Sequence, residues 1–207
     1  MEKQQFNKVL QFFTVLWVFT IIGLLIGTVL PQIFILPLSI VTLILLIAMM
    51  FSRTMRRLGR FISIIVATLV GITFYSALNF YLGALGGGVV LLILGTTAII
   101  FIAAGLYGYY TKRDFTNKGS ILFILLVGLI AFSIIAIFVK FSSVVWIFVS
   151  ALGVIVFTVY TIFDMNQIAK QPIKDEDVPM IALNLYLDFI NLFQYLLSLV
   201  YNIRRTF

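Results

Sequence analysis

The sequence predicts an all-α membrane protein built from seven transmembrane helices, and two observations lead to this fold class. First, 63% of the 207 residues are hydrophobic and only 10% are charged, whereas a soluble domain is about half apolar and about a quarter charged. Such a chain has too little polar surface to cover a core in water, and it lacks the high charge of disordered chains. Second, the chain divides into seven apolar stretches, each close to the length that an α-helix needs to cross a bilayer.

Short polar, basic or glycine-rich breaks separate the seven stretches. We expect one integral membrane domain over residues 1–207, with spans at 12–30, 33–51, 61–82, 89–110, 121–139, 144–169 and 179–200. The first stretch is expected to be retained as a span, because it is longer than the apolar region of a signal peptide and has no A-x-A-like cleavage site. Gly23 and Gly27 within it form a G-x-x-x-G pattern, which predicts close packing against another helix.

The positive charges predict the orientation of the protein. With seven spans the termini lie on opposite faces, and eleven of the 14 Lys and Arg residues then fall on the N-terminal face. Because cytoplasmic loops are enriched in Lys and Arg, we expect the N-terminus in the cytoplasm and the C-terminus outside. The net charge of +7 then indicates contact with the anionic leaflet of the membrane, and no nucleic-acid partner is expected.

The chain contains no cysteine and no histidine. Disulfides, thiol catalysis, imidazole or thiolate metal sites, Ser–His catalysis and a histidine pH switch are therefore excluded. Of the 7 acidic residues, only Asp164 and Asp188 fall inside predicted spans. A carboxylate at membrane depth costs about 2.5–3.5 kcal/mol, which makes these two aspartates the candidate functional residues.

Asp164 and Asp188 are expected at similar depths in neighbouring antiparallel spans. Counting at 1.5 Å per residue from the cytoplasmic ends of the last two spans places them about 9 Å and about 12 Å deep. Asn184, Asp188, Asn191 and Tyr195 fall on one stripe of an otherwise apolar helix. Such a stripe predicts a face toward the bundle interior or a water cavity. The alternative is that these residues only hydrogen-bond one helix to another.

Two carboxylates that share a site do not both ionise readily, so the pair is expected to titrate as a unit and to serve as a pH sensor. When deprotonated, the pair offers the hard oxygen ligands that suit Ca²⁺, and the amide carbonyl of Asn184, Asn191 or Asn166 can add to them. We therefore expect Ca²⁺ as a bound or transported ion at Asp164 and Asp188, and no other cofactor.

A cationic partner for the pair is available in Arg53, at the cytoplasmic end of the second span. Arginine pairs well with carboxylates and has a long side chain, so Arg53 can form a latch to Asp164. The alternative is that Arg53 belongs only to the basic cytoplasmic loop, as we expect for Arg56, Arg57 and Arg60.

The strings TIFDMNQIA around Asp164 and ALNLYLDFINLFQYLL around Asp188 resemble the last two helices of the Bax inhibitor-1 family, also called the transmembrane Bax inhibitor motif (TMBIM) family. The likeness is strongest to the bacterial, YetJ-like branch, and it extends to LPLSI in the second span and GITFY in the third. It implies a bundle with the C-terminal helix at its centre. It also implies a pH-sensitive Ca²⁺ leak channel of a bacterial plasma membrane, with Asp164 and Asp188 as the paired aspartates and Arg53 as the latch.

Other functions remain open on the residues alone. A proton-coupled cation exchanger could use one acidic pair for both ions in alternation. A regulatory protein acting on a membrane protease or on a cell-death or stress pathway would leave no motif. Diaspartyl intramembrane proteases also pair two aspartates, but they carry G-x-G-D where this chain reads LYLD, so we expect no enzymatic activity. The expected partners are the lipid bilayer, Ca²⁺, protons and other membrane proteins, and the chain is expected to be a monomer.

Overall fold

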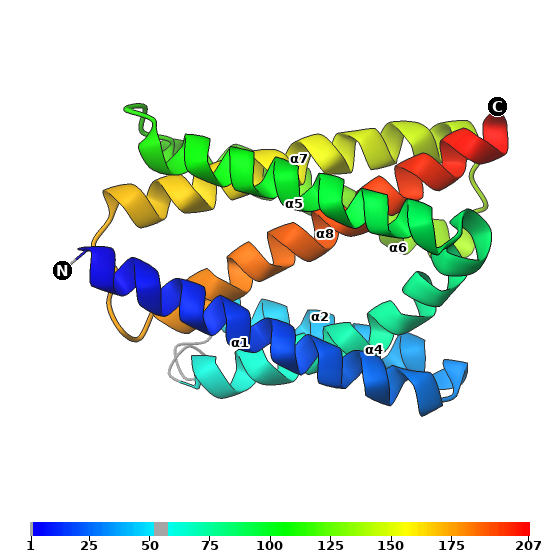
Figure 1. The fold of residues 1–207 in the computed structure, drawn as a ribbon, viewed down its shortest axis with the longest axis horizontal. Helices are drawn as coiled ribbons and strands as arrows, with labels where there is room; N and C mark the ends of the chain where they lie inside the picture. Colours follow the sequence, from blue (N-terminus) through cyan, green and yellow to red (C-terminus); the bar gives the residue numbers. More distant parts are fainter. Residues whose placement is uncertain (1, 52–57) are drawn as a thin grey trace. The chain divides into compact units, whose positions relative to one another are not determined.

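In the computed structural model, residues 2–51 and 58–207 are described, and the regular structure within these ranges is helical (Figure 1). Seven helices in this part of the chain are long and apolar enough to cross a membrane, which confirms the predicted all-α membrane fold. They are α1 (Glu2–Val29), α2 (Ile35–Phe51), α4 (Gly59–Leu85), α5 (Gly87–Tyr110), α6 (Gly119–Phe138), α7 (Ser143–Lys170) and α8 (Val178–Thr206). The short 3₁₀ helices η1 (Gln32–Phe34) and η2 (Thr116–Lys118) precede α2 and α6.

Several helices extend beyond the predicted apolar spans into polar segments, whereas α2 begins two residues inside its predicted span. α1 begins at Glu2, ten residues before the predicted span, and α8 has 29 residues and ends at Thr206. At 1.5 Å per residue α8 is about 43 Å long, whereas the hydrocarbon core of a bilayer is about 30 Å thick. An apolar run marks the part of a helix that lies in hydrocarbon, and it does not mark the polar turns that continue the helix.

The chain divides into two compact units that share α8. The first unit comprises residues 1–83 and 172–186, and the second comprises residues 84–171 and 187–207. α1, α2 and nearly all of α4 therefore belong to the first unit, and α5, α6 and α7 to the second. α8 contributes its residues up to Tyr186 to the first unit and those from Leu187 to the second. Half of the most apolar window of α8 is buried, a larger share than in the other six helices.

α1 and α4 pack closely in the first unit because glycines lie at their contact. A Cβ atom on Gly23 would overlap the carbonyl oxygen of Thr68, and a Cβ atom on Gly71 would overlap the backbone of α1. Gly27, one turn along α1, lies against the side chain of Tyr75. The close packing predicted from the G-x-x-x-G pattern is confirmed, and Gly71 on α4 is its counterpart.

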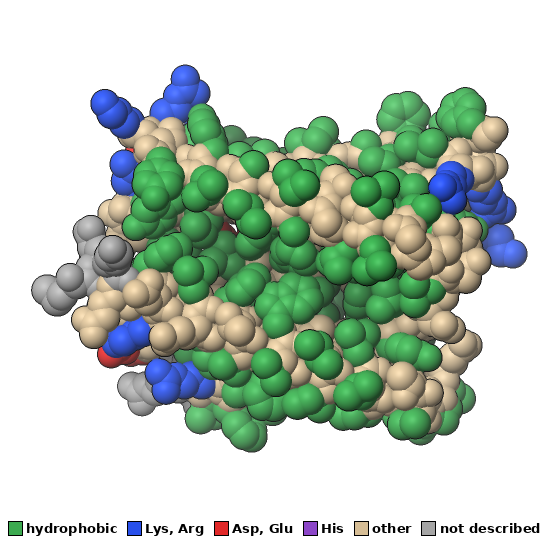
Figure 2. Space-filling view, in the orientation of Figure 1, with side chains coloured by type: hydrophobic (Ala, Val, Ile, Leu, Met, Phe, Trp, Pro, Cys, Tyr) green, Lys and Arg blue, Asp and Glu red, His purple; other side chains and the backbone are tan. Residues whose placement is uncertain are grey.

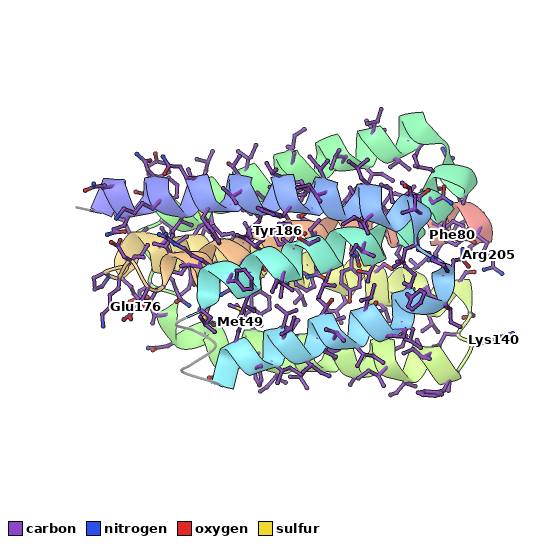
Figure 3. The ribbon with its side chains drawn as sticks, turned by 90° about the horizontal axis from the view of Figure 1, so that it is seen from below. Met49, Phe80, Lys140, Glu176, Tyr186 and Arg205 are labelled. Carbon is purple, nitrogen blue, oxygen red and sulfur yellow. The ribbon has the colours of Figure 1, made fainter. Side chains whose placement is uncertain are left out.

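The first part of α8 is attached to α1 through Tyr186, which is fully buried (labelled in Figure 3). The Tyr186 hydroxyl and Thr20 Oγ1 lie 2.7 Å apart and share a hydrogen bond. The Tyr186 ring meets Trp17 edge to face, with ring centroids 5.5 Å apart. α8 is thereby held within the first unit by a polar contact as well as by apolar packing.

One end of the first unit is polar and holds the connection between α7 and α8. Lys8 Nζ on α1 lies 2.7 Å from Asp175 Oδ1 in that connection. Hydrogen bonds from the side chains of Lys8 and Gln5 hold the pKa of Asp175 below its usual range. Met49, near the end of α2, lies at the same end of this unit as Glu176 (Figure 3). Two spans separate the N-terminus from the end of α2 and six separate it from the α7–α8 connection, and these even numbers predict the grouping.

The second unit is built on α7. α5 lies beside α7 (Figure 1), and a Cβ atom on Gly108, near the end of α5, would overlap the Ile162 carbonyl group of α7. α6 also packs against α7. A buried apolar cluster joins three of the helices, with Leu129 from α6, Val156 and Phe157 from α7, and Leu192 from α8.

Large apolar side chains cover the outer surfaces of the helices. Figure 2 shows hydrophobic side chains along the helices and Lys and Arg side chains gathered near helix ends. On α5, the side chains of Ile99, Ile102 and Leu106 are all more than half exposed. Lipid tails solvate such a surface, whereas water does not.

The basic residues assigned to the C-terminal face lie together in the second unit. Lys140 and Arg205 are at the same end of this unit (Figure 3). Arg204, beside Arg205, donates a hydrogen bond of 3.5 Å to the carbonyl oxygen of Leu85, the last residue of α4. The predicted segregation of basic residues thus holds within this unit, and the assignment of the two faces to cytoplasm and exterior stays a prediction.

We expect Gly23→Ala to lower the thermal stability of the detergent-solubilised protein, because the new methyl group would be forced into the Thr68 carbonyl oxygen. Overpacking of this kind costs about 1–3 kcal/mol. Gly95→Ala is the matched control, since a Cβ atom on Gly95 in α5 meets nothing within 4 Å. The midpoint of thermal unfolding should fall for Gly23→Ala and hold or rise for Gly95→Ala. Equal midpoints for the two variants would contradict close packing at Gly23.

Candidate functional site

α7 and α8 form an antiparallel seam in the second unit. Ser150 Oγ on α7 and Ser198 Oγ on α8 lie 2.7 Å apart and share a hydrogen bond. Three residues along α7, Gly153 lies directly against the ring of Tyr195 on α8. These two contacts fix the register of the two helices, and this register determines which residues meet farther along the seam.

The seam brings the two candidate aspartates together. The register places Tyr160 opposite Asp188, and Asp164 lies one helical turn beyond Tyr160, or about 6 Å along the axis at 1.5 Å per residue. Asp164 lies within electrostatic range of Asp188, and both lie within range of the Tyr160 hydroxyl. The carboxylates are therefore close neighbours on a diagonal, with Asp188 the deeper of the two as the depth count predicted, and Tyr160 is a third polar group beside them.

Asp188 is the more enclosed of the two carboxylates. Its residue is only 4% exposed, whereas Asp164 is partly exposed. Asp188 Oδ2 is buried and has no hydrogen-bond partner among the described residues. Buried polar atoms nearly always have a partner, and burying an unpaired charge is costly. A proton on Asp188 or a cation beside it would remove that cost.

The oxygen atoms around the pair suit a hard cation that is also coordinated by neutral ligands such as water. Two carboxylates and a phenol offer oxygen atoms only, which is the chemistry that Ca²⁺ prefers. Within residues 2–51 and 58–207, no group of three or more acidic, His or Cys side chains is placed to hold a metal ion. Because Ca²⁺ takes six to eight oxygen ligands, most of its ligands here would be water or carbonyl groups.

An aromatic and apolar layer follows the carboxylate pair along the seam. Phe157 stacks on Tyr160 on one side and on Tyr195 on the other, with ring centroids 5.9 Å and 5.7 Å apart. Leu192 from α8 and Leu129 from α6 pack around Phe157 in the buried cluster. Tyr195, predicted to support the pair, therefore belongs to this layer, and its hydroxyl is hydrogen-bonded to the side chain of Ser133.

A second polar cluster lies beyond this layer. Ser150 is fully buried and shares its hydrogen bond with Ser198. Asn202 Nδ2 donates to the Ser198 carbonyl oxygen at 2.7 Å and to Ser198 Oγ at 3.3 Å. We call these three residues the Ser–Asn cluster. This cluster was not predicted, although the stripe on α8 continues through it in alternating steps of three and four residues, at positions 188, 191, 195, 198 and 202.

The other predicted supporting residues on α8, Asn184 and Asn191, lie one on each side of Asp188 along its stripe. Asn184 is exposed. Asn191 Nδ2 donates to the Leu187 carbonyl oxygen one turn back on its own helix, at 2.8 Å. Arg53, the predicted latch, lies outside the described residues.

Asn166 holds a connecting segment against α7 instead of facing the pair. It lies two residues after Asp164, so it points about 200° around the helix from it. Its side chain is fully buried and accepts a hydrogen bond from Phe115 N at 2.9 Å. It also donates to the carbonyl oxygens of Gly108 and Arg113, both at 3.0 Å. Asn166 therefore fixes the end of α5 and the following segment to the turn of α7 that carries Asp164.

The segment held by Asn166 is also ordered from within. Asp114 Oδ1 accepts hydrogen bonds from the side chain and the backbone N–H of Thr116, at 2.6 Å and 2.9 Å. These two bonds hold the pKa of Asp114 below its usual range. This carboxylate has hydrogen-bond partners of its own in a connecting segment, so it is distinct from the enclosed pair.

Comparison with known proteins assigns the chain to a family. The sequence model of the family described as "Inhibitor of apoptosis-promoting Bax1" matches residues 2–205, nearly the whole chain. The chain belongs to the Bax inhibitor-1 family. The resemblance noted from the two aspartate-bearing helices is confirmed by this match.

Bacterial proteins are among the relatives of this chain. An uncharacterized protein of Borreliella burgdorferi is 35% identical over 142 residues, which cover 65% of this chain and 59% of the relative. An uncharacterized protein of Helicobacter pylori J99 is 31% identical over 73% of this chain and 65% of the relative. The inner membrane protein YbhL of Escherichia coli K12 is 38% identical over 117 residues, 52% of this chain and 50% of YbhL.

The matches span about half to two thirds of the length of these relatives. Together with the seven apolar helices, they establish a multi-pass integral membrane protein of this family. YbhL is described as an inner membrane protein, and its name says nothing of a transported ion.

We expect Asn166→Ala to destabilise the protein, because the change leaves two carbonyl groups and one N–H group without their partner. A buried polar group left unpaired costs about 1–3 kcal/mol. Asn184→Ala is the matched control, since Asn184 is exposed. Unfolding of both variants in detergent, followed by circular dichroism, should show a clear loss for Asn166→Ala alone. Similar curves for the two would mean that Asn166 does not hold the segment.

Proposed function

We propose that this Bax inhibitor-1 protein is a pH-sensitive Ca²⁺ leak channel in which Asp164 and Asp188 form the ion site and the pH sensor. The observation that carries the proposal is the meeting of two carboxylates within membrane-spanning helices, one of them with a buried oxygen that lacks a partner among the described residues. An intramembrane acidic residue is costly and marks an ion or proton pathway by default. The resemblance to YetJ-like proteins points to the same function.

The charge of the pair would decide which cation it holds. With one shared proton the pair carries a single negative charge, which one guanidinium group balances. When that proton leaves, the pair carries two negative charges, and a divalent cation balances them better than one arginine does. Acid would therefore favour a closed state in which Arg53 is bound to the pair, and higher pH would favour Ca²⁺. Arg53 enters this scheme from the sequence and from the family resemblance.

The same chemistry favours transport over hydrolysis. A diaspartyl protease needs room beside its aspartates for a substrate backbone, and the residues before Asp188 are Leu185, Tyr186 and Leu187 rather than glycines. Leu185 and Tyr186 are buried. We therefore propose that the protein has no enzymatic activity. We also propose that its N-terminus lies in the cytoplasm, as the distribution of Lys and Arg predicts, and that it acts as a monomer.

We expect purified protein in liposomes to release Ca²⁺ at a rate that rises with pH, because protons and Ca²⁺ compete for the same carboxylates. Asp164→Asn together with Asp188→Asn should abolish the pH dependence, since the amides keep the shape of the side chains and cannot titrate. Asp114→Asn is the matched control, because Asp114 is a carboxylate of a connecting segment with partners of its own. Fluorescence of a Ca²⁺ indicator inside the liposomes gives the rate.

The same flux assay separates the alternatives. An unchanged pH–flux curve in the double variant would remove the pair as the sensor. Flux that requires an opposing proton gradient would assign a proton-coupled exchanger instead. Absence of Ca²⁺ flux from the wild-type protein at all pH values would overturn the channel and leave a regulatory role in the membrane.

We expect Arg53→Ala to raise the Ca²⁺ leak at acidic pH, because the singly charged pair would lose the cation that competes with Ca²⁺. At high pH the variant and the wild type should leak at similar rates. Arg56→Ala is the control, since it removes one positive charge from the same basic loop. An equal leak from both variants at acidic pH would show that Arg53 contributes only to the general charge of the loop.

A further inference from the structure

Two buried polar clusters on the α7–α8 seam are separated by a single apolar layer. The carboxylate pair lies on one side of the layer, and the Ser–Asn cluster lies on the other. On α8, Asn191 and Ser198 flank the layer seven residues apart, which is about 10 Å at 1.5 Å per residue. An ion or a file of water that follows the seam from the carboxylates has only this layer to cross before it meets polar atoms again.

Tyr195 closes the seam within that layer because its ring is seated on a glycine. A Cβ atom on Gly153 would overlap Cγ and Cδ1 of the Tyr195 ring, so the ring lies directly against the α7 backbone. Phe157, one turn along α7, stacks on the ring with an interplanar angle of 23°. The absence of a side chain at position 153 is therefore what gives the ring its place against α7.

The atoms beyond the ring suit the passage of a cation. The Ser–Asn cluster offers two hydroxyl groups and an amide, which are neutral and oxygen-bearing. Such groups can replace part of the hydration shell of a cation without holding it as tightly as carboxylates do. Conduction requires sites of this weaker kind, and apolar constrictions between them close a path by excluding water.

We propose that Tyr195 is the gate of an ion path along the α7–α8 seam. The gate is closed while the ring lies against Gly153, and it opens when the ring moves away from Gly153. The Ser–Asn cluster is then the next binding site for the cation. This inference rests on the proposed function, because it takes the carboxylate pair as the cation-binding site that precedes the gate. It adds a closure on the seam that is separate from the Arg53 latch.

The first test alters the contact between Gly153 and the Tyr195 ring and leaves the carboxylates in place. Gly153→Ala should displace the ring and raise Ca²⁺ flux severalfold at a pH where the wild type leaks slowly, and Tyr195→Ala should do the same. Tyr195→Phe keeps the ring and should leak like the wild type. Gly128→Ala, in α6, is the matched control, because a Cβ atom there meets nothing within 4 Å. If Gly153→Ala and Gly128→Ala leak equally, Tyr195 is not the gate.

The second test does not depend on Ca²⁺ transport. Because the chain has no cysteine, Asn191→Cys introduces a single thiol between the carboxylates and the ring. A membrane-impermeant methanethiosulfonate reagent is added to the face that carries Arg204 and Arg205. We expect slow labelling in the otherwise wild-type protein and labelling at least severalfold faster when Gly153→Ala is added. Gly128→Ala should leave the labelling slow.

The two tests separate failure of the gate from failure of the channel. If Ca²⁺ flux is present and depends on the carboxylates, but labelling of the thiol is indifferent to Gly153→Ala, the gate is wrong and the proposed function stands. If no variant transports Ca²⁺ and labelling still accelerates with Gly153→Ala, the closure by Tyr195 stands and the Ca²⁺ channel is wrong. Size-exclusion chromatography of each variant identifies any that misfold, and Tyr195→Ala then replaces Gly153→Ala in the labelling.

Discussion

The antiparallel contact between α7 and α8 is the interaction on which the candidate site depends. Each helix presents to it a row of residues in alternating steps of three and four, which is the spacing of a left-handed coiled coil. On α7 the row is Ser150, Gly153, Phe157, Tyr160 and Asp164. A purely structural seam would place leucine or small residues at these positions. Here carboxylates, aromatic rings and hydroxyl groups occupy them. The contact between the two helices therefore contains polar groups where apolar packing would otherwise stabilise it.

The remainder of the second unit holds α7 in place for that contact. Gly108 lets α5 lie against the Ile162 carbonyl group. Asn166 then fixes the segment after α5 to the same turn of α7 that bears Asp164. The position of Asp164 is thus determined within one unit. Asp188 lies on the helix that both units share, two residues after Tyr186, where α8 leaves the first unit. Any displacement of α8 along α7 therefore changes the distance between the two carboxylates.

Much of the fold could be predicted from the sequence, because the bilayer imposes a simple rule on each span. Seven apolar runs gave seven helices, and the G-x-x-x-G pattern at Gly23 gave a close contact with α4. The two aspartates stood out because few charges lie in the apolar runs. The helix ends were predicted less well, since polar residues such as those after Glu2 continue a helix in the headgroup region.

The contacts of single polar side chains could not be predicted, because they depend on the register between helices. Asn166 is two residues from Asp164, and helical geometry alone turns it away from the pair. That it ties down the segment around Phe115 requires the tertiary fold. Ser198 and Asn202 follow the same spacing as Asp188 on α8, so their place on the seam could be predicted from the sequence. The third member of the cluster, Ser150, could not, because only the contacts between α7 and α8 determine which α7 residues face them.

Hydrogen bonding between helices is the simplest alternative account of the polar residues, and it explains the two clusters unequally. It accounts for Ser150, Ser198 and Asn202, whose side chains bond to one another or to nearby backbone. It does not account for Asp188, whose buried Oδ2 has no partner within the described ranges, although asparagine has nearly the same shape and carries no charge. An aspartate retained at such a cost, beside a second aspartate, favours exchange of a proton or a cation over adhesion. The neutral cluster beyond Tyr195 can serve both purposes, because hydroxyl groups that bond to each other when the seam is closed can bond to water or to a cation when it opens.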